Sequence, residues 1–379
     1  MNKKEIQEIK KQFRRKTKCI SRICGCYFDI DGNKKLSYGT SFLNLPEEED
    51  AKYLKLLESV LSGKIGRNLH NCAYDRNEEL HGRTHELLMR LRETELKDDA
   101  LLQEFYDLMI EKLPKDRSYL LLLAHCYYDV PVKGSDGFMQ EDESDQVYNY
   151  LVSAICPVEL AEGSLSYNEA DNCIESRFRD WVVEAPLRGF LFPAFTDRTT
   201  DIHTLLYYVK KSEYLTDSFL QEGFGLETPK PDKEQRENFT ALISGIGAEE
   251  PVDLETVSSI HEELDKCLEA HKDDSVPFVL DKPELKGILR SSGLAESQMN
   301  RFDSLYADCC EDYPLLAANV AGGKRLQIEV KDIRISVPRE SMGFLETRIL
   351  DGKKCLVITA DDDMSVDGVP IEIRRETGR

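Results

Sequence analysis

The chain has 379 residues, with 71 Asp or Glu against 50 Lys or Arg, and a net charge of −21 at neutral pH. This length fits two or three modules, and no apolar run reaches the ~18–20 residues of a membrane-spanning helix. The chain has eleven cysteines, and an odd number in a chain this long does not indicate a disulfide framework. Reduced thiols are typical of the cytosol, so we expect a cytoplasmic protein.

The basic charge is concentrated at the N-terminus. Residues 1–22 hold nine Lys or Arg against two Glu, which leaves −28 on the remaining chain. The spacing of Ile6, Ile9 and Phe13 predicts an amphipathic helix, which either docks on the acidic body or binds an anionic partner such as nucleic acid. The side chains available for such a partner are Lys3, Lys4, Lys10, Lys11, Arg14, Arg15 and Lys16. No membrane partner is expected.

Residues 1–220 are predicted to form a body of helices and a mixed sheet. Strands are expected at 22–30, 35–42, 118–130 and 147–158, and helices at 46–61, 84–92 and 98–113. The segment 118–130 is almost continuously apolar and indicates a buried central strand, whereas 133–145 is polar and acidic and predicts a loop.

A hairpin is predicted near the end of this body. The aromatic segments 188–195 and 202–210 flank a polar turn, and Pro193 favours an edge or a bulge. The turn and the position after it gather two carboxylates, a guanidinium and an imidazole, a set able to bind a cation or to perform acid–base chemistry. The candidate catalytic residues are therefore Asp197, Arg198, Asp201 and His203, although Asp and Thr are also common in ordinary turns.

The composition changes after Tyr214. We expect a linker at 221–232, a helical segment at 233–320 with helices at 254–271, 283–291 and 296–310, and a β-hairpin module at 325–375. The predicted fold class is thus α+β.

The histidines give weak metal signals. His81 and His85 stand four residues apart, but Gly82 lies between them and no third ligand is evident, so a surface location is the competing interpretation. His125 lies within the apolar run and is interpreted as a hydrogen-bonded core residue. No complete metal, nucleotide or nucleophile motif is present, and no cofactor is expected.

Several stretches together resemble one known family. They are MNKKEIQEIKKQF, RICGCYFD, RDWVVEAPLRGFLFPAFTDRTTDIHTLLYYVKK, HKDD with VLDKPELKGIL, and ETRILDGKKCLVI. This combination is similar to the domain-of-unknown-function family 4317, which occurs in anaerobic, mostly clostridial bacteria. The resemblance covers essentially the whole chain and implies a bacterial cytosolic protein, without implying an activity or site residues. The order of helix, buried strand and second strand also looks like that of 37-kilodalton nucleoid-associated proteins.

Three functions follow as hypotheses. The absence of a complete catalytic motif favours a non-enzymatic binding or regulatory protein. The alternatives are a nucleoid-associated protein, which would use the basic N-terminal helix or the helical hairpin 283–310, and a hydrolase or metal-dependent enzyme, which would use the 197–203 hairpin tip.

Overall fold

The chain folds into two compact units. A computed structural model describes residues 1–14, 19–133, 139–163, 165–169, 171–176, 180–272, 274, 277–323, 325–360, 364–366 and 368–371. The first unit comprises Met1–Arg236 and His271–Phe278, and the second comprises Glu237–Ala270 and Val279–Arg379. Both helices and strands are abundant, which confirms the α+β class. Within the described residues, no helix is long and apolar enough to cross a membrane.

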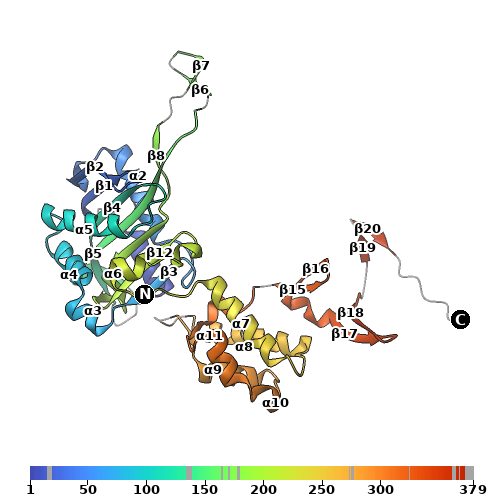
Figure 1. The fold of residues 1–379 in the computed structure, drawn as a ribbon. Coiled ribbons are helices and arrows are strands. Elements are labelled where there is room, and N and C mark those ends of the chain that lie inside the picture. The colour runs from blue at the N-terminus through green and yellow to red at the C-terminus, as the bar shows by residue number, and fades with distance from the viewer. Residues whose placement is uncertain are drawn as a thin grey trace. The chain divides into compact units, whose positions relative to one another are not determined.

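The first unit is built on one eight-stranded sheet with the order β2-β1-β4-β5-β9-β12-β3, and β8 pairs with β5 beside this path (Figure 1). The strands are β1 (Ile20–Phe28), β2 (Lys34–Ser41), β3 (Leu69–Ala73), β4 (Ser118–Lys133), β5 (Met139–Leu160), β8 (Trp181–Val183), β9 (Arg188–Phe192) and β12 (Thr204–Val209). Every described strand pair in this sheet is antiparallel, which corrects the expected mixed sheet. Two of these pairs, β1 with β2 and β4 with β5, follow each other directly in the chain, which favours antiparallel pairing because parallel pairs need long crossovers.

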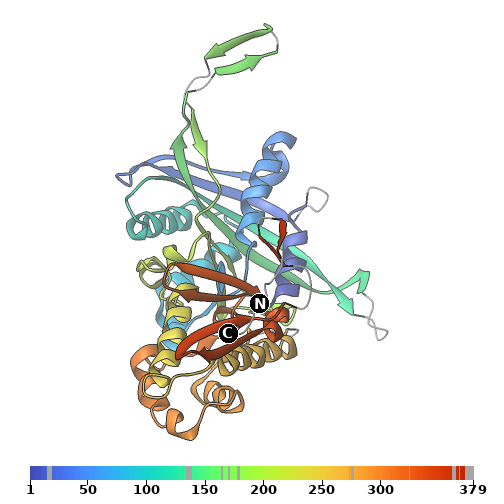
Figure 2. The ribbon, with the colours of Figure 1, turned by 90° about the vertical axis from the view of Figure 1, so that its right-hand side faces the viewer.

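Helices cover both faces of this sheet (Figure 2). One face packs against α4 (Arg83–Glu93), α5 (Asp99–Lys112) and α6 (Phe219–Phe224), whose core includes Leu88, Phe105 and Phe224. The short helix α3 (Arg76–His81) precedes α4 and has no buried residue. The other face packs against α1 (Lys3–Lys11) and α2 (Glu47–Val60), through Ile9 and Leu57 among others. The near-continuous apolar sequence of β4 follows from this arrangement, because both of its faces are buried.

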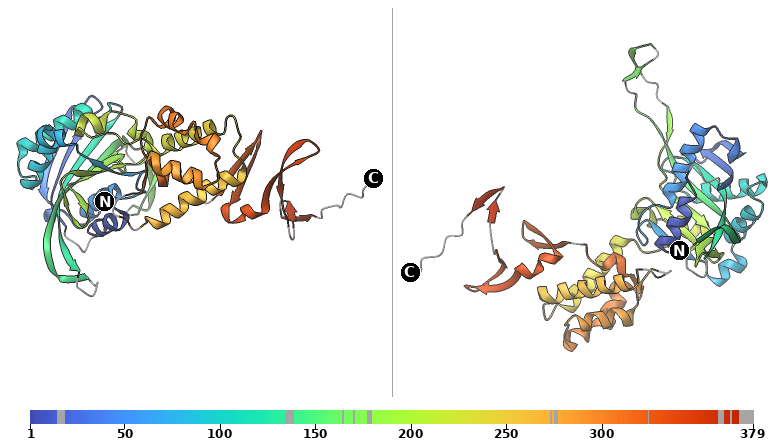
Figure 3. Two further views of the ribbon diagram at one scale, coloured as in Figure 1. Left: turned by 90° about the horizontal axis from the view of Figure 1, so that it is seen from below. Right: turned by 180° about the vertical axis from the view of Figure 1, so that it is seen from behind.

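Two hairpins extend beyond the sheet. The expected loop at 133–145 is wrong, because β4 and β5 continue as a paired ribbon until Lys133 opposes Met139 (Figure 3). Residues 133–145 are polar and acidic, a composition that loops and paired strands can share. At the other end of β5, β6 (Leu165–Asn168) and β7 (Cys173–Ser176) form a hairpin that projects past β8 (Figure 1).

The second unit combines a helical core with small hairpins. Its helices are α7 (Asp232–Ile246), α8 (Leu254–Ala270), α9 (Lys282–Ser291), α10 (Glu296–Met299), α11 (Phe302–Cys310) and α12 (Ala317–Val320). The single helix expected at 296–310 is thus interrupted after Met299. Short strands β13 (Val279–Leu280) and β14 (Leu315–Leu316) pair beside these helices.

The C-terminal hairpins form three separate two-stranded sheets. They are β15 (Arg325–Val330) with β16 (Ile333–Pro338), β17 (Leu345–Leu350) with β18 (Lys353–Ile358), and β19 (Met364–Val366) with β20 (Val369–Ile371). A 3-10 helix, η3 (Arg339–Phe344), joins the first hairpin to the second. This part of the chain therefore forms paired strands, although these strands do not merge into one sheet.

Candidate functional site

The predicted hairpin tip is an anchor for the N-terminal helix. It is formed by β10 (Ala194–Thr196) and β11 (Thr199–Asp201), with Asp197 and Arg198 at positive φ in the turn. The backbone N–H of Asp197 donates to Glu5 Oε1 at 2.8 Å, and Arg198 Nη2 donates to Glu8 Oε1 at 2.9 Å. Asp201 accepts a hydrogen bond from the Thr196 hydroxyl. The contacts of Asp197 and Arg198 thus hold α1, whereas Thr200 of the tip lines the pocket described below.

The basic helix α1 docks on the sheet through its apolar face. Ile6, Ile9 and Phe13 are buried, and Asn2 and Glu5 form a capping box at its start. Lys10 donates to the Ser62 hydroxyl at 2.7 Å. Of the other predicted anion-binding residues, Lys3, Lys4, Lys11 and Arg14 are exposed, whereas Arg15 and Lys16 lie outside the described residues.

The structure does not bring the candidate histidine ligands together. His81 is exposed at the end of α3, whereas His85 is buried in α4, where Nε2 lies 3.0 Å from the carbonyl oxygen of Ile202. Gly82 separates the two helices and caps the second. His203 lies instead 2.6 Å from Glu79. In the described part of the chain, no group of three or more His, Cys, Asp or Glu is arranged to hold a metal ion.

A polar pocket of about 290 Å³ lies on the α4 side of the sheet, around His125 of β4. Strand β5 contributes Val147 and Asn149 to its lining, and the hairpin strand β11 contributes Thr200. The remaining lining residues come from the end of α4 and its following turn, and they are Arg92, Glu93 and Glu95. The pocket therefore collects one imidazole, one guanidinium, two carboxylates and two neutral polar groups within one small volume.

An irregularity in β1 places a serine beside this histidine. The register between β1 and β4 shifts between Ile20 and Arg22, so Ser21 occupies a bulge opposite His125. Ile20 belongs to the core on the α1 side, whereas Cys24 belongs to the core on the α4 side. The extra residue reverses the alternation and turns Ser21 toward the face that carries His125. Ser21 Oγ lies 2.6 Å from His125 Nδ1.

The turn after α4 places a carboxylate in the lining of the same pocket. Glu95 and Leu96 both have positive φ, at 54° and 58°, which non-glycine residues rarely adopt. Leu96 is fully buried in the core, so its packing holds the turn in this conformation. Glu95 stays exposed, pairs with Lys97, and acts on the charge of His125. Strained backbone at an exposed pocket is typical of sites that position ligand-binding groups.

Burial favours the neutral form of the His125 imidazole. Its side chain is almost fully buried, and this desolvation lowers its pKa, an effect that Glu95 opposes. The Ser21 hydroxyl also lies 3.2 Å from the carbonyl oxygen of His125. One hydroxyl hydrogen satisfies both contacts only if Ser21 donates to the carbonyl and Nδ1–H donates to Ser21. In this assignment Nε2 is unprotonated and available to a ligand.

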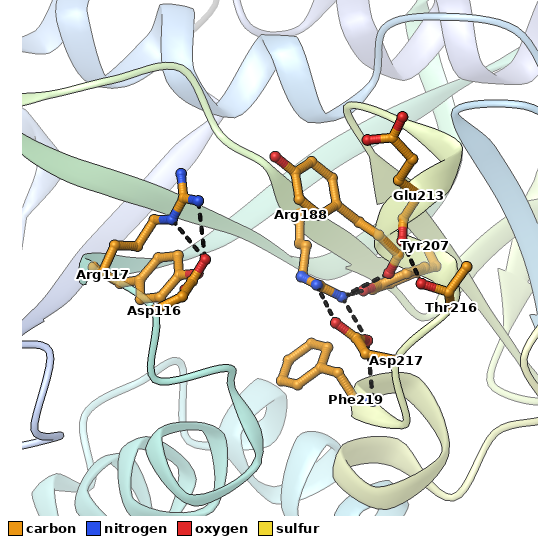
Figure 4. Close-up of polar contacts among 10 residues, drawn as sticks. Asp116, Arg117, Arg188, Tyr207, Glu213, Thr216, Asp217 and Phe219 are labelled. Atoms are coloured by element: carbon orange, nitrogen blue, oxygen red, sulfur yellow. Dashed lines mark hydrogen bonds and ion pairs between the residues drawn. The ribbon is translucent and has the colours of Figure 1, made fainter.

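A second buried polar cluster fastens the chain after β12 (Figure 4). Arg188, at the start of β9, donates through Nη1 to the Tyr214 carbonyl at 2.7 Å and forms a two-point ion pair with Asp217. Its guanidinium also lies 5.3 Å from the Phe219 ring centroid. The guanidinium of Arg188 thus binds groups of the segment that leads into α6. We therefore interpret this cluster as structural.

Sequence reasoning identified few of the pocket residues. It singled out His125 as a core histidine, and burial and the bond to Ser21 agree with that description. It gave no signal for Ser21, Glu95 or Asn149, because a β-bulge and a positive-φ turn leave no motif in a single sequence. A histidine within an otherwise apolar strand was the one available signal.

Comparison with known proteins shows the family. The family model named domain of unknown function, DUF4317, matches residues 1–369, which is almost the whole chain. No curated protein matches this chain.

Proposed function

The chain belongs to the DUF4317 family, and we propose that its first unit is a binding protein for a small zwitterion of the amino-acid type. The observation that carries this proposal is the presence of opposite charges in the pocket that His125 lines. Arg92 offers a guanidinium for a carboxylate, and Glu93 offers a carboxylate for an ammonium group. His125 Nε2 then accepts one further hydrogen bond. A volume of about 290 Å³ limits the ligand to a small molecule.

Thermal unfolding of the full chain with a panel of L-amino acids tests this function. A ligand at 100 times its Kd stabilises the folded protein by about 2.7 kcal/mol, so a saturable rise in Tm is expected for at least one amino acid. Acetate and methylamine, which each carry one charge, are expected to give no rise. The variants Arg92→Gln and Asn149→Ala should lose the effect, whereas the control Asp129→Ala on the exposed part of β4 should keep it. The absence of any saturable rise would contradict the proposal.

General-base catalysis is a second candidate, because the neutral imidazole faces a polar pocket. A base with a pKa below the operating pH is ready to take a proton from water or from a bound substrate. This candidate keeps the hydrolase hypothesis but moves it from the 197–203 tip to His125. Conversion of a bound ligand by the parent protein, abolished in His125→Gln, would support it; binding without any conversion would leave the binding function alone.

DNA binding is a third candidate, supported by the exposure of Lys3, Lys11 and Arg14 on the docked helix. Deletion of α1 is a poor test, because its apolar face belongs to the core. The triple variant with Gln at these three positions keeps the helix and removes the charge. Parent protein that shifts duplex DNA at low salt, with loss of the shift in the variant, would support this function; no shift by the parent would exclude it.

A further inference from the structure

The second unit contains a groove that none of these functions uses. It has a volume of about 570 Å³. It lies between one face of α8 and the part of the chain where η3 ends and β17 begins. The α8 side is lined by Asp253, Leu254, Glu255, Ser258, Ser259 and Glu262. The opposite side is lined by Met342, Gly343, Leu345, Glu346 and Thr347.

Two hydrogen bonds attach the chain on either side of the first hairpin to α8. Arg339, at the start of η3, donates to Asp265 of α8 at 2.5 Å, and its side chain is only 17% exposed. The backbone N–H of Gly322 donates to His261 Nδ1 at 3.2 Å, one turn before Asp265. These two contacts attach the chain before and after the first hairpin to the same helix, so the wall formed by β17 stands opposite the N-terminal half of α8.

Strand β17, which contributes Leu345, Glu346 and Thr347 to the groove, has one open edge. In the described structure β17 pairs with β18 only, so its other edge carries backbone N–H and C=O groups without a strand partner. An isolated two-stranded hairpin is marginally stable in water, and a third strand would stabilise it. An extended peptide can supply such a strand through main-chain hydrogen bonds.

The wall formed by α8 is acidic and therefore suits a basic peptide. Glu255 and Glu262 are exposed along the groove face of α8, and Asp253 caps its start by accepting from the backbone N–H of Thr256 at 2.7 Å. Met342 and Leu345 add apolar surface beside these carboxylates. Lys or Arg side chains of a peptide in the groove would pair with these carboxylates, and its aliphatic side chains would pack against Met342 and Leu345.

We propose that this groove binds an extended, basic segment of a partner protein, which adds as a third strand to the free edge of β17. The inference is independent of the pocket around His125, because all residues involved belong to the second unit. The chemistry that recognises the partner is a strand with alternating cationic and aliphatic side chains and free backbone amides.

Fluorescence anisotropy with the full chain tests the proposal. The probe is a labelled, end-blocked peptide of alternating Lys and Val, and the comparison peptides alternate Glu and Val or carry backbone N-methyl groups on alternate residues. Saturable binding of the Lys–Val peptide is expected, with at least tenfold weaker binding of both comparison peptides. Equal binding of the N-methylated peptide would overturn strand addition, and absence of Lys–Val binding at low salt would overturn the proposal.

Variants locate the binding. The double variant Glu255→Gln and Glu262→Gln removes two charges with little change of shape, and we expect Lys–Val affinity to fall about threefold to tenfold. The control Asp308→Asn removes an exposed charge of α11, outside the groove lining, and should leave affinity unchanged. An equal loss in both variants would show non-specific attraction to an acidic protein and would overturn the site.

Discussion

The buried ion pair between Arg188 and Asp217 should respond unequally to loss of its two members. The Arg188 side chain is 5% exposed, whereas the Asp217 side chain is 33% exposed. In Asp217→Ala the guanidinium stays buried without its counterion, which costs ~3–5 kcal/mol of unfolding free energy. In Arg188→Met an aliphatic chain fills much of the space, and the remaining carboxylate is exposed enough to be hydrated.

The variant Arg188→Met also loses the hydrogen bond to the Tyr214 carbonyl. We therefore expect its free energy of unfolding to fall by about 1–3 kcal/mol. Because the protein has two units, urea unfolding should be followed by hydrogen exchange of peptides that cover 188–192 and 212–224, which report on the first unit alone. A larger loss in Arg188→Met than in Asp217→Ala, or a loss below about 1 kcal/mol in both, would refute this reasoning.

Three further predictions concern the first unit. Burial lowers the pKa of His70 to about 4, so the unfolded state binds the proton first as pH falls; the unfolding free energy should decrease between about pH 6.5 and pH 4, and urea midpoints of His70→Gln should show a flatter dependence. A Cβ at Gly189 would lie 2.4 Å from the Ser153 carbonyl oxygen, so Gly189→Ala should lower the Tm strongly or prevent folding, whereas Gly287→Ala, with open space around it, should not lower the Tm. Arg198→Ala should speed hydrogen exchange in α1, because its bond to Glu8 is lost; unchanged exchange would show that apolar packing alone holds the helix.

Much of the fold follows from local patterns in the sequence. The apolar run at 118–130 leads to a central strand because both faces are covered by helices. The helix expected at 283–291 is present as α9, and Asp281 caps its start by accepting from the backbone N–H of Glu284. The ribbon formed by β4 and β5 was missed, because a polar paired strand outside the core and a polar loop have the same composition.

The candidate site could be predicted only in part, for a related reason. Turn composition at 197–203 correctly indicated a hairpin, but the tertiary partners of Arg198 and His203, which are Glu8 and Glu79, come from distant segments. The contact between Ser21 and His125 depends on the bulge in β1, which appears only once β1 is paired with β4. Single-sequence patterns do not encode such pairings between segments a hundred residues apart.

The protonation state of His125 directly tests the claim that its Nε2 is unprotonated and can accept a hydrogen bond from a ligand. Nitrogen NMR of the full chain labelled at histidine, with His125→Gln to assign the signals, resolves the two ring nitrogens at pH 7. We expect a neutral ring with the proton on Nδ1, bonded to Ser21, and an unprotonated Nε2 whose signal moves when a ligand binds. A ring that is charged at pH 7, or neutral with its proton on Nε2, would contradict it.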